Sequence, residues 1–324
     1  MGKRALTSIL LASLCLAAAP GFAAPLQKAD IHLGANWALH ADVDAFRNST
    51  LGKLLLAELK AQGIEEKMQG FAAIFSFNPL ADLRGVTLYG KGQDRNNAVA
   101  IIDGKFNPDT LLNVIRWNPQ YQEIPYEGVT LHRWLNEDNK KDTTTDQLMY
   151  GYIHDGQRVV ISSGLDALKQ AVSTLKGSPA GTSTGLLNQI PQAAGGTYLQ
   201  IVATGIGDIV GQDPKAAILR QADSLNLAAG EVTEKVFIGL RLQGQSPEVA
   251  ENILKMAQGV VAMAQLAVQE QPKLSELAKS VNISREDKTV QARFEAPAQS
   301  IFAFLKEQWA KKNQQQQTPQ TTTP

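Results

Sequence analysis

The sequence predicts an α+β protein of two related halves, each an antiparallel sheet with helices packed on one face. Short polar turns between successive apolar strands, such as Asp155-Gly156, are typical of antiparallel hairpins. A segment of the chain also recurs at a nearly constant distance along the sequence. Strands do not alternate regularly with crossover helices, which argues against a dinucleotide-binding fold.

The recurrence is clearest around two predicted helices. Residues 107–116 match residues 246–255 at an offset of 139, with an N-cap residue, a proline and an acid at each start. The offset persists upstream, where Val99–Ile101 matches Ile238–Leu240. Downstream, Asp155-Gly156 corresponds to Glu286-Asp287 at an offset near 131. We interpret this pattern as an internal duplication.

The first half contains an additional helical segment. Trp37–Val43 corresponds to Tyr198–Thr204, but the amphipathic stretch Thr50–Phe75 has no counterpart in the second half. Strands are predicted near residues 36–43, 85–90, 97–103, 121–134, 147–153 and 157–163. Helices are predicted near residues 50–62, 64–76, 108–117 and 165–176, the last with a capping box from Ser163 to Asp166 and a stop at Gly177.

The two ends of the chain are predicted to lie outside the folded halves. Residues 1–23 have the basic start, apolar run and small-residue exit of a signal peptide, with no transmembrane anchor left after its removal. Residues 311–324 follow the last apolar position and are predicted to be a disordered tail. Between them we expect a first half at 24–183 and a second half at 184–310.

Cysteine usage and charge limit the compartment and the partners. The only cysteine, Cys15, lies within the signal-like run, so the mature chain relies on a hydrophobic core and not on disulfides. Because secreted eukaryotic proteins are usually rich in disulfides, the absence of cysteine from the mature chain favours a bacterial periplasmic or extracellular protein. Removal of Lys3 and Arg4 leaves 29 basic against 31 acidic residues, a net charge of −2. Such a nearly neutral chain argues against nucleic-acid binding.

The stretch containing His40, Asp42 and Asp44 is the candidate site. Alternate residues of a strand share a face, and imidazole with two carboxylates suits a divalent metal such as zinc or manganese. The competing interpretation is the polar, water-facing side of a strand, with Ala41 and Val43 turned inward and Asp44 capping the next turn. We favour the second interpretation, because the corresponding strand in the second half carries no histidine or acid.

Other candidate groups are weaker. His132 could approach His40 if their strands pair. Ser162-Ser163-Gly164 does not have the flanking glycines of a serine nucleophile elbow. The apolar helix near 247–269 is predicted to be either a core helix or one wall of an apolar cavity.

At Leu39–Asp44, Leu83–Tyr89 and the Asp155-Gly156 hairpin, the chain resembles uncharacterised secreted bacterial proteins of conserved hypothetical families. That resemblance implies no catalytic residue, and whether the protein is an enzyme stays open, with a non-enzyme favoured. We therefore predict a secreted or periplasmic binding protein without a cofactor, whose partner is an apolar small molecule or another envelope protein. The alternative is a metal-dependent hydrolase using His40, Asp42 and Asp44.

Overall fold

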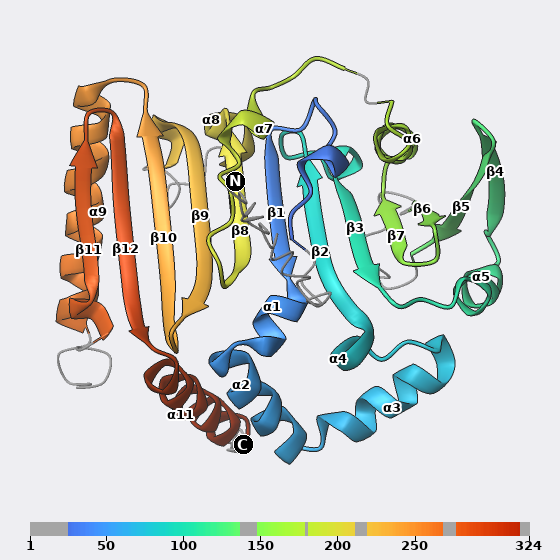
Figure 1. Ribbon diagram of the computed structural model, residues 1–324, viewed down its shortest axis with the longest axis horizontal. Helices are drawn as coiled ribbons and strands as arrows, with labels where there is room; N and C mark the ends of the chain where they lie inside the picture. The colour runs from blue at the N-terminus through green and yellow to red at the C-terminus, as the bar shows by residue number, and fades with distance from the viewer. Residues whose placement is uncertain (1–24, 137–147, 179–180, 211–218, 268–276, 318–324) are drawn as a thin grey trace, which may run out of the picture.

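One continuous sheet forms the centre of the protein. The computed structural model describes residues 25–136, 148–178, 181–210, 219–267 and 277–317. Within them, twelve strands pair antiparallel in the order β11-β12-β10-β9-β8-β1-β2-β3-β7-β6-β5-β4 (Figure 1). The α+β prediction is confirmed. The sheets predicted for the two halves are joined into one, because β1 pairs with β8 at the centre.

The elements follow the chain in this order. The strands are β1 (Trp37–Asp42), β2 (Leu83–Gly90), β3 (Val99–Gly104), β4 (Gln122–Tyr126), β5 (Val129–Leu135), β6 (Leu148–His154), β7 (Arg158–Ser162), β8 (Thr197–Thr204), β9 (Ala222–Val232), β10 (Lys235–Gly244), β11 (Val281–Glu286) and β12 (Thr289–Pro297). The helices are α1 (Val43–Asn48), α2 (Thr50–Ala61), α3 (Ile64–Phe75), α4 (Pro79–Asp82), α5 (Pro108–Arg116), α6 (Leu165–Leu175), α7 (Leu186–Gln189), α8 (Ile206–Val210), α9 (Pro247–Ala267) and α11 (Ala298–Gln317).

The strand order repeats from the centre outward. Beyond β1 come β2, β3, β7 and β6, and beyond β8 come β9, β10, β12 and β11, which is the order that the predicted duplication would give. The strand registers contradict one part of the sequence alignment, the match of Val99–Ile101 in β3 with Ile238–Leu240 in β10. Val99 shares a face with Ala38, whereas Ile238 lies on the opposite face, so the two residues do not correspond. A shift of one residue reverses the face of every side chain in a strand.

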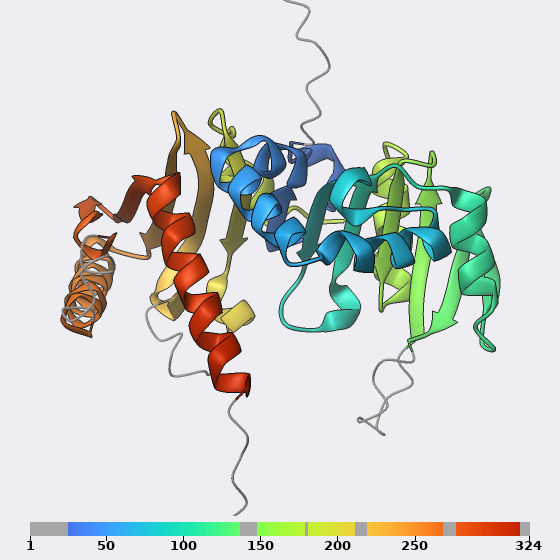
Figure 2. The same cartoon turned by 90° about the horizontal axis from the view of Figure 1, so that it is seen from below.

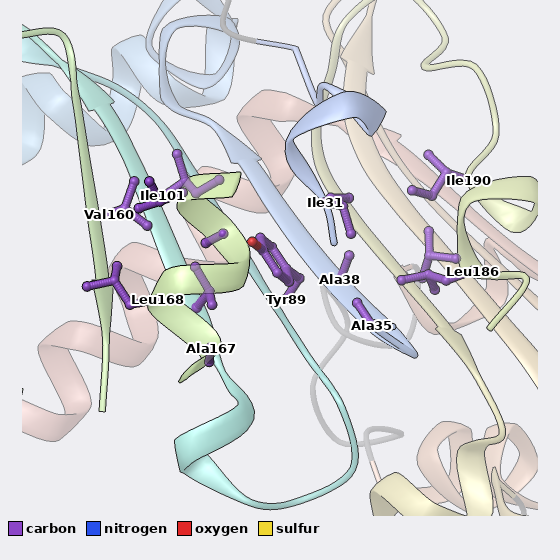
Figure 3. Close-up of a cluster of buried hydrophobic side chains, with 14 of the residues drawn as sticks. Ile31, Ala35, Ala38, Tyr89, Ile101, Val160, Ala167, Leu168, Leu186 and Ile190 are labelled. Atoms are coloured by element: carbon purple, nitrogen blue, oxygen red, sulfur yellow. The ribbon is translucent and has the colours of Figure 1, made fainter. Parts of the chain in front are cut away.

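The two halves bury opposite faces of the sheet. Ala38, Tyr89 and Val202 lie on one face and join the core beneath α6, which contains the fully buried Leu168 (Figure 3). Trp37 and its cross-strand partner Ala203 point the other way and pack in the core beneath α9. Successive residues of a strand face opposite sides, so a single central strand contributes to both cores.

Helices from both ends of the chain meet below the strands. Figure 2 shows α11 beside the α1–α3 stretch, and the Lys306 ammonium lies 2.7 Å from a Glu58 carboxylate oxygen. The backbone N–H groups of Thr50 and Leu51 donate to the carboxylate of Glu231 in β9, at 2.6 and 2.9 Å. A carboxylate at the start of a helix compensates unpaired donors. These contacts link α2, in the helical insertion of the first half, to α11 and β9 of the second half.

Three local features differ from the predicted elements. The region near 121–134 is a hairpin of two strands, because Glu127 and Gly128 both have positive φ and form a tight turn. The N-cap of α6 is Gly164, and the Ser163 hydroxyl donates to the Arg95 carbonyl instead of capping the helix. Helix α11 continues to Gln317, into the predicted tail, since lysine and glutamine are good helix formers.

The predicted signal peptide, residues 1–23, lies outside the described residues. Within the described part of the chain, none of the helices combines the length and apolar character needed to cross a membrane.

Candidate ligand-binding site

In the structure, His40, Asp42 and Asp44 each contact a different partner. All three side chains are buried, not turned to water. The Nδ1 atom of His40 lies 2.9 Å from the Thr87 hydroxyl on β2, and the register also places His40 opposite the buried Gln200 on β8. His40 therefore belongs to a row of buried polar residues that runs across the central strands, because β1 is paired with a strand on each side.

The two carboxylates have structural partners. Asp42, not Asp44, is the N-cap of α1, where its Oδ1 accepts from the Ala45 N–H at 2.8 Å. Asp44 forms a 2.5 Å ion pair with Arg47, and the second oxygen of Asp44 has no hydrogen-bond partner among the described residues. Burial raises the pKa of Asp44 more than Arg47 lowers it, with a smaller upward contribution from Asp42. These contacts are those of a helix start.

The helix predicted near 247–269 is only partly a core helix. Ala250 and Ile253 of α9 are fully buried against the sheet. Val260, Met263 and Leu266, farther along the helix, are exposed by 56–68%. The apolar stripe is thus longer than the sheet surface that covers it.

A cleft between α5 and the outer strands of the first half brings together chemically useful side chains. Its volume is about 510 Å³. The lining residues are Pro108, Leu112 and Arg116 of α5, Glu123 of β4, Val129, Thr130 and His132 of β5, and Tyr152, Ile153 and Gly156 around the β6–β7 hairpin. The three α5 residues are spaced by four and so share one helix face.

Local sequence explains how both walls form. Asn107 caps α5 by accepting from the Thr110 N–H at 3.0 Å, and Pro108 occupies the first turn. On β5, Leu131 is fully buried in the core beneath α6, whereas Thr130 and His132 face the cleft. One face of β5 therefore packs in the core, and the other face presents polar side chains to the cleft.

A chain of hydrogen bonds fixes the protonation of His132. The Tyr121 hydroxyl lies 2.8 Å from Glu123 Oε1 and 2.9 Å from His132 Nδ1. A carboxylate can only accept, so the single hydroxyl proton of Tyr121 goes to Glu123 and Nδ1 of His132 donates to the tyrosine oxygen. Arg116 completes the chain, 2.9 Å from the same Glu123 oxygen.

The pKa shifts agree with this arrangement. The hydrogen bond from Arg116 is the main cause that lowers the pKa of Glu123, followed by the bond from Tyr121. Burial lowers the pKa of His132, which keeps its imidazole neutral near pH 7. With the proton on Nδ1, the Nε2 atom of His132 is a hydrogen-bond acceptor. The cleft thus combines apolar and polar side chains, and His132 presents an oriented acceptor among them.

This cluster was not predicted from the sequence, and His132 does not meet His40. Four strands, β2, β3, β7 and β6, separate β1 from β5. The signal that could have revealed the cluster is the Glu127-Gly128 turn, because a hairpin there places Glu123 directly opposite His132. The prediction of one continuous strand over residues 121–134 misses that pairing.

The described residues define an α+β protein built on one twelve-stranded antiparallel sheet. No family model and no curated protein matches the chain. A solved structure of TP0453 in crystal form III has 10% sequence identity and a TM-score of 0.48, covering 86% of this chain and 97% of its own. Crystal form I of TP0453 gives 10% identity and a TM-score of 0.45, with 87% and 97% covered.

Proposed function

We propose that this chain is a non-enzymatic binding protein, exported to the periplasm or beyond, whose α5 cleft takes a small amphipathic molecule. The observation that carries the proposal is the cleft of about 510 Å³, which is lined by both apolar and polar side chains and includes the hydrogen-bonded imidazole of His132. Ligand pockets in proteins combine mostly apolar lining with a few oriented polar groups. Leu112, Val129 and Ile153 supply the apolar contacts.

The ligand is expected to donate a hydrogen bond. Nε2 of His132 accepts, and the Arg116–Glu123 pair fixes the ring through Tyr121. Orienting groups that are set before binding reduce the entropy cost of association. The signal-like start of the chain supports an exported protein, and the lack of cysteine after Cys15 favours a bacterial one.

Blocking the cleft tests the proposal. Thr130→Trp places an indole among the lining residues, and we expect it to weaken binding of the amphipathic dye 1-anilinonaphthalene-8-sulfonate by about tenfold or more. Dye fluorescence during titration measures this. Gln243→Trp on the exposed part of β10 is the matched control and should leave the affinity unchanged. Equal dye binding by all three proteins would contradict a binding role for this cleft.

The alternative of a metal-dependent hydrolase at His40, Asp42 and Asp44 has a separate test. Within the described ranges, no three or more His, Cys, Asp or Glu side chains lie close enough to form a metal site. We expect protein purified without chelator to contain less than about a tenth of an equivalent of zinc or manganese. Elemental analysis measures this, and stoichiometric metal that disappears in His40→Ala would favour the hydrolase.

A further inference from the structure

A second pocket lies on the opposite side of the first half, between the chain before β1, the end of β2 and α6. Its volume is about 310 Å³, which suits a small ligand. The polar residues lining it are His32, Tyr89, Lys91, Asn97, Gln170 and Thr182. None of the lining residues is an aspartate or a glutamate. The pocket is therefore rich in hydrogen-bond donors and carries positive charge.

The ring of His32 is held in one orientation. The Gly34 N–H donates to His32 Nδ1 at 3.1 Å, so the neutral imidazole carries its proton on Nε2 and can donate it. A Cβ atom added at Gly34 or Gly181 would lie 3.0 or 3.1 Å from His32 Cε1. Gly181 also has a φ of +107°, which side chains rarely adopt. Two glycines thus make room for this ring.

Tyr89 forms part of the wall of this pocket. The residue is only 2% exposed, and its hydroxyl lies near the His32 backbone N–H, with no described residue that accepts its proton. Burial is the main cause that raises the pKa of Tyr89, with a smaller contribution from Asp30, so the hydroxyl stays protonated. That hydroxyl is shielded from solvent, so the donors that a ligand can reach in this pocket are those of His32, Lys91 and the polar lining residues.

Lys91 provides the cationic group of this pocket. Its side chain is exposed and forms no ion pair with another described residue. A free ammonium beside amide, hydroxyl and imidazole donors is suited to a group with several acceptor oxygens. No carboxylate lines the pocket to repel such a group.

We infer that this pocket binds a small ligand through an anionic oxygen group, a carboxylate or a phosphate. His32 Nε2–H and the Lys91 ammonium contact the anion, with Gln170, Thr182 and Asn97 available to the rest of the molecule. The pocket is separate from the α5 cleft and shares no lining residue with it. The inference therefore stands whether or not the cleft binds an amphipathic molecule.

Titrations of the whole mature chain with inorganic phosphate and with acetate, followed by NMR, test this inference and distinguish the two anions. We expect saturable shifts with at least one of them, and an affinity about tenfold or more weaker in Lys91→Gln and in His32→Gln. Lys105→Gln, at another exposed lysine, is the matched control and should bind like the native protein. Dye binding in the α5 cleft should be unchanged in all of these variants.

Two results would overturn the inference. One is the absence of saturable shifts with both anions. The other is anion binding that Lys91→Gln does not weaken, since this substitution removes the charge of an exposed side chain and leaves the packing intact. Loss of dye binding in Thr130→Trp without any change in anion binding would confirm that the two sites are independent.

Discussion

Replacement of Arg47 by methionine is expected to lower the free energy of unfolding by about 3–5 kcal/mol. The Asp44 side chain is only 3% exposed, and the Arg47 guanidinium at 2.5 Å is its ion-pair partner. Removal of the guanidinium leaves a buried carboxylate without a counter-charge. Arg47 also donates to the Leu83 carbonyl at 2.7 Å, a bond that methionine cannot make. Urea unfolding of both proteins at pH 7 measures the difference.

The pH dependence and a double variant identify the cause. The pKa of Asp44 is already raised by burial in the native protein, and loss of Arg47 raises it further. A carboxyl with a raised folded-state pKa costs stability in full above that pKa, and the cost shrinks as the pH falls from there to the lower pKa of the unfolded chain. The deficit of Arg47→Met should therefore shrink toward acid pH. Asp44→Asn/Arg47→Met should lose less stability than Arg47→Met alone, and equal losses would reject the buried charge as the cause.

Leu168→Ala is expected to destabilise both halves of the protein together. Leu168 is fully buried in the core beneath α6, and truncation of such a leucine costs about 2–5 kcal/mol. The sheet continues through the β1–β8 pairing, and Ala38 and Trp37 of β1 reach the cores on opposite faces. A cavity in the first half should thus lower the unfolding midpoint of the second half as well.

Differential scanning calorimetry measures this coupling between the two halves. We expect a single transition whose calorimetric and van't Hoff enthalpies agree, in the native protein and in Leu168→Ala. Lys169→Ala, at the neighbouring position of the same helix, is the control and should change the midpoint little, because this residue is not part of either core. Two separate transitions, with only the first shifted by Leu168→Ala, would mean that the halves unfold independently.

Elements that depend on nearby residues were predicted accurately. Helix α5 was expected at 108–117 from the cap Asn107 and from Pro108, and it spans Pro108–Arg116. The Asp155-Gly156 turn joins β6 and β7 as expected, with both residues at positive φ. Caps and tight turns are formed by residues that are neighbours in the sequence, so their signals are present in any short window.

The surroundings of β1 could not be predicted in the same way. The alternation of His40 and Asp42 with Ala41 predicts a strand whose polar side faces water, but His40 lies opposite Thr87 and Gln200 on neighbouring strands. The partner β8 is far away in sequence, and nothing near β1 specifies that it is covered on both sides. Burial of a strand depends on its neighbours in the sheet and not on its own pattern.

The sequence by itself determined the class of fold and the positions of most helices and strands, because period, caps and turns are local. The tertiary structure alone decided that the two halves share one sheet and bury opposite faces of it. It also decided which polar residues converge. Arg116, Glu123 and His132 meet only after a hairpin folds against a helix, and His32 meets Lys91 only after β1 pairs with β2. Such contacts depend on strand register and long-range pairing, which short sequence patterns do not specify.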